Sequence, residues 1–200
     1  HEAGDSLPNL MVLSLPNDHS AGTSPNFPTP DAMVADNDLA VGRIMEMISK
    51  SKYWDSTVVF ITQDDSQGGW DHISAYRTVG MVASPYSSGK LVSTHYNQVS
   101  MLRTIEQILG IPPMNIMDAT SRLMTDCFQS NPNKAIYVAR PNNIPLDKMN
   151  KPLHALRGKE RKLAELSQNE LFKEVDGGRD DEMNKVIWFY TKGNKAYPKN

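Results

Sequence analysis

An uninterrupted apolar run that ends at two adjacent aspartates, VVFITQDD, constrains the fold more than any other feature of the chain. Residues 58–62 are β-branched or aromatic and do not alternate with polar residues, a pattern typical of a strand covered on both faces in an α/β sheet. Ligands of such sheets bind at the carboxyl ends of the strands. Asp64 and Asp65 follow at this end, and neighbouring carboxylates repel each other unless a cation or a shared proton neutralises them. The pattern therefore indicates a metal site; the alternative is a solvated loop whose aspartates cap the next element.

The remaining elements are expected to follow an α/β order. A second apolar run, Leu10–Leu15, predicts a strand that ends at a polar turn containing Asp18 and His19. Thr29, Pro30 and Asp31 combine an N-cap residue, a proline at the first helical position and an acid in the first turn, so a helix is expected to run from there to about Ser51. Strand, helix and strand would then form a βαβ unit.

Downstream, residues 78–83 predict a third strand and residues 97–109 a helix that stops at Gly110. The expected core face of that helix is Val99, Leu102, Ile105 and Ile108 or Leu109. We expect a short helix within 114–128, a loop over 129–144, a helix-prone stretch over 158–175 and a last helix from Asp180. The predicted domains are an α/β core over 1–128 and a loop with a helical tail over 129–200.

Composition narrows the possible functions. The 200 residues carry a net charge of −2, and 39% of them are hydrophobic, which is ordinary for a globular chain. This balance argues against nucleic acid as a partner. No apolar run reaches the roughly 20 residues that a membrane-spanning helix needs. The single cysteine, Cys127, excludes an internal disulfide and a cysteine-based zinc site.

Four motifs in order, LPNDHSAG, PDAMVADNDLAVGRIMEMI, ITQDDSQGGWDH and VASPY, resemble those of bacterial phosphoesterases. This group includes phospholipase C-like and acid phosphatase-like enzymes of the alkaline phosphatase superfamily. The similarity covers residues 10–113, and MNKVIW with the later Tyr197-Pro198 is similar to the C-terminal end of the same family. The resemblance implies a three-layer α/β/α fold with a mostly parallel sheet. It also implies that the chain is the C-terminal half of an enzyme whose nucleophile and first metal-binding acid come from segments before His1.

The resemblance also implies roles for individual residues. Asp64, Asp65 and His72 would hold a divalent metal ion, with His72 supported by the nearby glycines that permit close approach of the backbone. His19 would act on the substrate phosphoryl group or ligate metal, and His95 would reach a phosphate. Asp18 would orient His19 or contact the substrate. The alternatives are a turn or hydrogen-bonding role for His19 and an ordinary surface position for His95.

Two departures from the superfamily pattern suggest a modified, single-metal site. Leu15 stands where the superfamily often has an aspartate, and Asp64-Asp65 stands where an Asp-His pair is common. Imidazole with carboxylate suits zinc or manganese, whereas carboxylates alone would favour magnesium or calcium.

The leading hypothesis is therefore metal-dependent hydrolysis of a small-molecule or lipid phosphoester, with this chain alone inactive until the missing N-terminal half supplies the nucleophile. The competing hypothesis is a non-catalytic fragment or degenerate α/β binding domain. A periplasmic or secreted location is implied by the resemblance alone.

Overall fold

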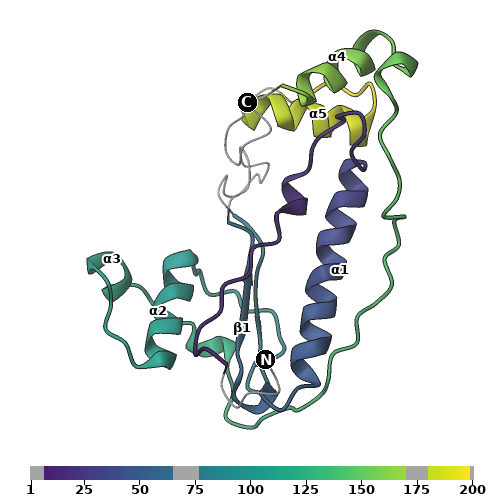
Figure 1. The fold of residues 1–200 in the computed structure, drawn as a ribbon. Coiled ribbons are helices and arrows are strands. Elements are labelled where there is room, and N and C mark those ends of the chain that lie inside the picture. The colour runs from purple at the N-terminus through teal and green to yellow at the C-terminus, as the bar shows by residue number, and fades with distance from the viewer. Residues whose placement is uncertain (1–6, 65–76, 170–179, 199–200) are drawn as a thin grey trace. The chain divides into compact units, whose positions relative to one another are not determined.

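The computed structural model of the chain describes residues 7–64, 77–169 and 180–198, which form two compact units (Figure 1). The first unit comprises residues 7–14, 48–64 and 78–136. The second comprises residues 15–47, 77, 137–169 and 180–198. The units interleave along the sequence, and the division into 1–128 and 129–200 stays a prediction.

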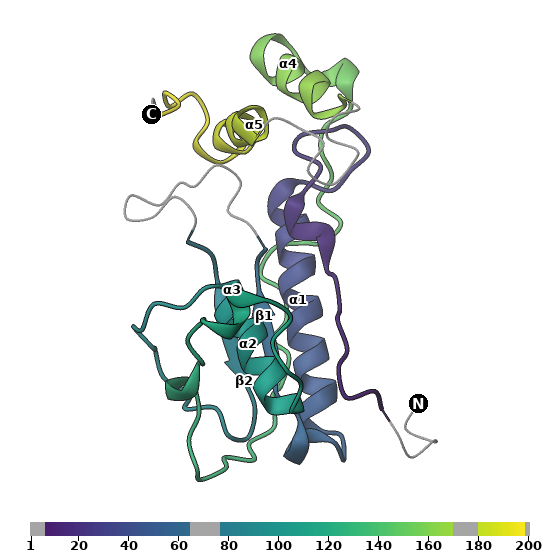
Figure 2. The same ribbon diagram turned by 90° about the vertical axis from the view of Figure 1, so that its left-hand side faces the viewer.

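The first unit contains a small antiparallel sheet. Strands β1 (Val59–Thr62) and β2 (Gly80–Ala83) pair in a register that runs from Val59 opposite Ala83 to Thr62 opposite Gly80 (Figure 2). Both strands were expected from the sequence and are confirmed. The parallel arrangement is wrong for this pair, because the chain reverses between the strands and the Gln63 amide donates to the Val79 carbonyl at 3.2 Å. A parallel pair would need a crossover connection instead.

The described fold is thus mixed α/β with a two-stranded antiparallel sheet, and the three-layer parallel sheet is not seen among the residues described. Among the described residues each strand pairs with only one neighbour, so both are less buried than a central strand of a larger sheet would be. The side chains of β1 are half-buried up to Ile61, and Thr62 is exposed. The expectation that this run is covered on both faces is therefore wrong.

The segment expected as a strand over Leu10–Leu15 is not one. Its first four side chains are exposed, Val12 to 87%. A strand exists only where its backbone groups pair with those of a neighbour, and neither β1 nor β2 pairs with this segment. The apolar run therefore does not complete a βαβ unit in the described structure, and that expectation is also wrong.

Helix α2 (Gln98–Leu109) begins and ends where the sequence predicts. The Asn97 side chain accepts from the Ser100 amide at 2.8 Å, and the Ser100 hydroxyl accepts from the Asn97 amide, which forms a capping box. Gly110 ends the helix at φ +68°, a left-handed conformation that suits glycine.

The buried face of α2 differs from the predicted one. Met101, Thr104 and Glu106 are buried, whereas Ile108 is 52% exposed. Met101 joins Met124 and Cys127 in a core cluster, and the half-buried side chains packed against it come from the sheet and the loops: Phe60, Val82, Val92, Tyr96, Ile105 and Phe128.

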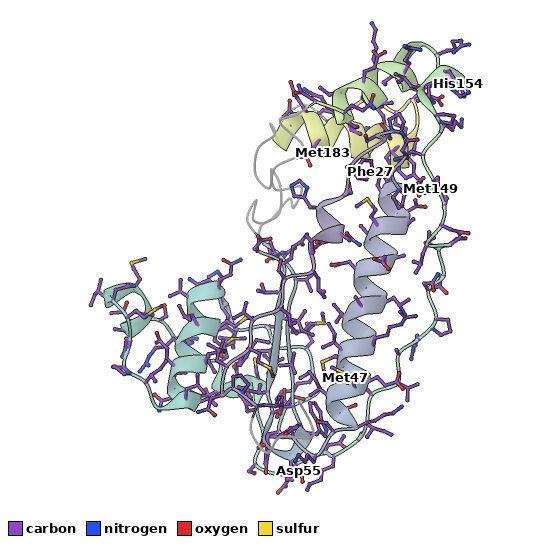
Figure 3. The ribbon with its side chains drawn as sticks, viewed as in Figure 1. Phe27, Met47, Asp55, Met149, His154 and Met183 are labelled. Atoms are coloured by element: carbon purple, nitrogen blue, oxygen red, sulfur yellow. The ribbon has the colours of Figure 1, made fainter. Side chains whose placement is uncertain are left out.

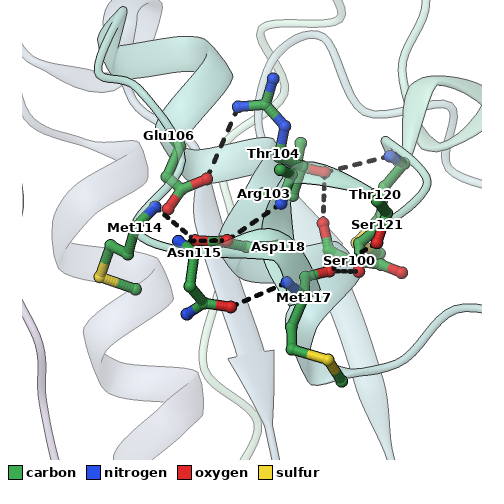
Figure 4. A network of polar contacts seen from close by, with 12 residues as sticks. Ser100, Arg103, Thr104, Glu106, Met114, Asn115, Met117, Asp118, Thr120 and Ser121 are labelled. Atoms are coloured by element: carbon green, nitrogen blue, oxygen red, sulfur yellow. Dashed lines mark hydrogen bonds and ion pairs between the residues drawn. The ribbon is translucent and has the colours of Figure 1, made fainter.

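Two carboxyl groups are buried where α2 meets the short helix α3 (Ile116–Ala119) (Figure 4). Asp118 and Glu106 are each 1% exposed. Asp118 accepts from three backbone amides, those of Met114 at 2.7 Å, Asn115 at 2.8 Å and Ala119 at 2.9 Å.

The pKa values of these two carboxyl groups shift in opposite directions. Burial raises the pKa of Glu106, and the neighbouring charge of Asp118 raises it further. Burial alone would raise the pKa of Asp118 too, but its amide donors and Glu106 outweigh burial and lower it. As the pair titrates, the proton is therefore held by Glu106 in preference to Asp118.

The second unit is helical. Helix α1 (Pro30–Ser49), whose last residues belong to the first unit, α4 (Gly158–Ser167) and α5 (Asp180–Lys192) confirm the three helices expected there, and α4 packs against α5 (Figure 1). No helix or strand forms over 129–144, as expected. Short 3₁₀ turns complete the described elements: Pro16–His19 (η1), Trp54–Ser56 (η2), Thr125–Cys127 (η3) and Leu153–Ala155 (η4).

Asp31 ties the start of α1 to other parts of the second unit. Its carboxylate accepts from Thr29 at 2.5 Å, from Tyr190 in α5 at 2.6 Å and from Lys148 at 2.7 Å. Burial would raise the pKa of Asp31, but these hydrogen bonds outweigh it and lower the pKa well below its usual range. Asp31 therefore has two roles: it interacts favourably with the helix dipole, and it connects the start of α1 to Lys148 and Tyr190.

Nearby, the chain around Phe27 lies beside Met149 (Figure 3), where Pro28 and Met149 form an isolated antiparallel bridge. The Asn150 amide donates to the Phe27 carbonyl at 3.0 Å. Within the part of the chain that is described, no helix has both the length and the apolar character to span a membrane.

Candidate functional site

Asp18 and His19 lie at the end of η1 in the second unit, and both are half-buried. Asn17 in the same turn donates to the Asp36 carboxylate of α1 at 2.6 Å. No hydrogen bond joins Asp18 to His19 in the described structure, so the orienting role of Asp18 stays a prediction.

The residue after His19 has a strained backbone. Ser20 has φ +59° and ψ +161°, a region that residues other than glycine occupy at a cost of about 1–3 kcal/mol. The side chain is 8% exposed, and its hydroxyl accepts from the Gly22 amide at 3.1 Å. Such a conformation persists only where the surroundings fix it.

Hydrogen bonds from distant residues provide that fixation. The Asn150 side-chain amide donates to the carbonyls of Gly22, Ser24 and Pro28 at 3.1, 2.9 and 3.2 Å. The Thr23 amide donates to the Ser167 hydroxyl of α4 at 3.1 Å. The loop after His19 is therefore held by the segment around Asn150 and by α4.

In the first unit, the end of β1 is fixed to the start of α2. The Gln98 side-chain amide donates to the backbone carbonyl of Gln63 at 3.4 Å and also to that of Asp64. Asp64 is exposed and directly follows the strand, as the sequence predicts. Because Gln98 opens α2, this contact brings the carboxyl end of β1 to the amino end of the helix.

His95 lies three residues before Gln98, in the loop that leads into α2. Its side chain is exposed, and none of the described residues hydrogen-bonds to its imidazole. The Gln98 contact thus joins the backbone of Asp64 to the start of the helix into which the His95 loop leads.

The proposed metal ligands are only partly described. Asp65 and His72 fall outside the described residues, which leaves Asp64 as the one predicted ligand whose position is known. The rest of the described chain has no group of three or more His, Cys, Asp or Glu side chains that could hold a metal ion. The described residues therefore do not form a complete ligand set, and no coordination geometry follows from them.

Sequence reasoning missed the residues that hold these segments. Gln98, Asn150 and Asp36 act through contacts with residues 19 to 128 positions away in the chain. An isolated Gln or Asn carries no periodic or spacing signal, so neither side chain could be singled out. Asp36 lies in the helix that starts at Pro30, and nothing in the helical pattern shows that its partner is in the His19 turn.

Comparison with known proteins gives one match. A family model described as the Phosphoesterase family matches residues 5–112. Neither the curated proteins nor the solved structures include a match to this chain. The matched residues contain the His19 turn, β1 with Asp64, and the loop of His95.

Proposed function

Because the chain belongs to the Phosphoesterase family, we propose that it hydrolyses phosphate esters with the help of a divalent metal ion. The observation that supports a specific location is the Gln98 contact, which joins the Asp64 backbone, at the carboxyl end of β1, to the start of the helix that follows the His95 loop. Phosphoryl transfer concentrates negative charge on the phosphoryl oxygens, so cations and hydrogen-bond donors around them lower the barrier.

We assign the metal to Asp64, Asp65 and His72, and the metal would supply charge neutralisation and polarisation of the phosphoryl group when bound. Zinc or manganese fits a ligand set with imidazole, whereas magnesium or calcium fits oxygen ligands. His95 would donate a hydrogen bond to the phosphoryl oxygens. As separate proposals that rest on the family resemblance alone, His19 contacts a phosphoryl group and Asp18 contacts the substrate or orients His19. The exposed imidazole of His95 is available for such a contact.

The substrate is proposed to be a small-molecule or lipid phosphoester, and the protein to reside in the periplasm or outside the cell. The family match supports cleavage of a phosphoester bond, but it does not identify the alcohol group of the substrate. Cell fractionation tests the location, and parallel assays with soluble and lipid phosphoesters test the substrate class.

The central experiment measures metal content and turnover together. The purified chain is loaded with zinc, manganese, magnesium or calcium, its bound metal is determined by elemental analysis, and it is assayed with p-nitrophenyl phosphate and bis(p-nitrophenyl) phosphate. We expect stoichiometric metal in the wild type and its loss in Asp64→Asn and Asp65→Asn. Asp55→Asn is the matched control, because Asp55 is an exposed aspartate of the same unit that pairs with Lys134 at 2.5 Å.

The outcomes separate the hypotheses. Retained metal in both variants would refute the ligand assignment. Metal binding without turnover would mean that the nucleophile is supplied from outside these residues, and turnover would mean that the chain holds its own. Neither metal nor turnover under any condition would favour the non-catalytic binding domain.

A further inference from the structure

The segment that carries His95 alternates between half-buried and exposed side chains. The half-buried side chains are Val92, Thr94 and Tyr96, and the exposed ones between and after them are Ser93, His95 and Asn97. Thr94 and Tyr96 are therefore turned toward the body of the unit, whereas the His95 side chain is exposed.

One carboxylate binds both neighbours of His95. Asp126 accepts from the Thr94 hydroxyl at 2.5 Å through one oxygen and from the Tyr96 hydroxyl through the other. These two hydrogen bonds lower the pKa of Asp126, and burial together with the same contact raises the pKa of Tyr96 to about 12. The carboxylate is thus ionised and the phenol is protonated across the neutral range.

Asp126 itself is held in place. It lies in η3, between Met124 and Cys127, which are both buried in the core cluster of the first unit. The Met124 amide donates to the buried Thr104 hydroxyl of α2 at 3.0 Å, and the Cys127 carbonyl accepts from the Ser88 amide at 2.8 Å. The backbone on either side of the exposed Asp126 is therefore fixed, and the His95 segment is tied to it through the Asp126 carboxylate.

The other end of the segment is equally constrained. Asn97 caps α2, and Gln98 binds the carbonyls of Gln63 and Asp64 at the end of β1. His95 thus lies between two anchors, although its own imidazole receives no hydrogen bond from the residues described.

We propose that Asp126 is a positioning residue, which holds Thr94 and Tyr96 so that the His95 imidazole is presented to the phosphoryl group of the substrate. This inference rests on the proposed function, because it assumes that His95 contacts phosphate. Asp126 does not touch the substrate and acts only through His95.

A double-mutant cycle on kcat/KM for p-nitrophenyl phosphate tests the proposal. We expect Asp126→Ala to lower kcat/KM by about 10- to 100-fold, the loss that displacement of a catalytic group by about 1 Å can produce. Tyr96→Phe should lower it less, because one of the two hydrogen bonds remains and the ring keeps its packing. Asp55→Ala, the exposed control aspartate, should leave kcat/KM unchanged.

The decisive comparison is the double variant Asp126→Ala/His95→Ala. If Asp126 acts through His95, the double variant has the kcat/KM of His95→Ala alone. A merely structural role would make the two losses multiply, and that result would overturn the proposal, as would an unchanged kcat/KM in Asp126→Ala.

A second readout does not depend on turnover. Inorganic phosphate is titrated into the chain while the NMR signals of the His95 imidazole are followed. We expect saturable shifts in the wild type and an apparent Kd weakened by at least about 10-fold in Asp126→Ala. Shifts with neither metal binding nor hydrolysis would refute the proposed function and keep the positioning role, whereas equal Kd values, or no shift in the wild type, would overturn the positioning role itself.

Discussion

Gly22, three residues after His19, lies where the chain cannot accept a larger residue. Its φ is +56°, and a Cβ at this position would lie 2.6 Å from the Ser167 hydroxyl oxygen. It would also lie 3.1 Å from a methyl carbon of Val186 and 3.2 Å from the sulfur of Met183, two side chains of α5 that are almost fully buried. We therefore predict that Gly22→Ala destabilises the second unit.

The cost has two sources. The left-handed conformation costs an alanine about 1–2 kcal/mol, and forcing a methyl group into a packed site costs about 1–3 kcal/mol. The lower entropy of the unfolded alanine chain offsets about 0.4–1 kcal/mol of this. The free energy of unfolding should therefore fall by about 1–5 kcal/mol, measured by urea denaturation with the fluorescence of Trp188 in α5 as the probe.

Gly193→Ala is the matched control in the same unit. Gly193 has φ +63°, but a Cβ there would meet nothing within 4 Å. This variant should therefore show only the conformational cost of about 1–2 kcal/mol, less the same offset of about 0.4–1 kcal/mol from the unfolded chain. Equal destabilisation in the two variants would refute the packing argument. Adding Ser167→Ala to Gly22→Ala removes the nearest atom and should recover part of the loss.

Three further predictions concern other buried or bridging groups. The pKa of Glu106 in the folded state is above its ordinary value of 4.5, so between these two values the folded state binds a proton that the unfolded state does not. The free energy of unfolding therefore falls as pH rises from 4.5 through the folded pKa. Glu106→Gln should remove this decline, measured as urea midpoints over the same pH range. Asn150→Ala should cost about 1–3 kcal/mol by leaving backbone carbonyls of residues 20–28 unpaired; an unchanged melting temperature would contradict this. Val186→Ala, at 0% exposure, should cost about 1–3 kcal/mol, whereas exposed Val138→Ala should stay within about 0.5 kcal/mol.

Local signals were sufficient to locate the helices. Pro30 and Asp31 marked the start of α1, and Asn97 with Gly110 marked both ends of α2. These residues act on the backbone within one turn, through a hydrogen bond, a fixed φ or a left-handed cap. A sequence therefore carries them without knowledge of the rest of the fold.

Strand pairing and side-chain burial were harder to predict from the sequence, because they depend on distant parts of the chain. The apolar run at 10–15 has the composition of a strand but no partner among the described strands, and the apolar character of β1 did not show that β2 would run antiparallel to it. Glu106 is buried beside Asp118 and its three amide donors, whereas Ile108 is exposed, and a helical period cannot reveal this arrangement.

The difference between local signals and distant contacts also explains why the sequence identified candidate histidines but not the residues that fix the backbone around them. Around His19 the hydrogen bonds are made by Asn17 and Ser20, and around His95 they are made by Thr94 and Tyr96. In both places the neighbours fix the backbone, and the imidazole is not needed to do so. A histidine held in this way can donate to a ligand without giving up a contact that stabilises the fold, which is the arrangement that preorganised recognition of an anion requires.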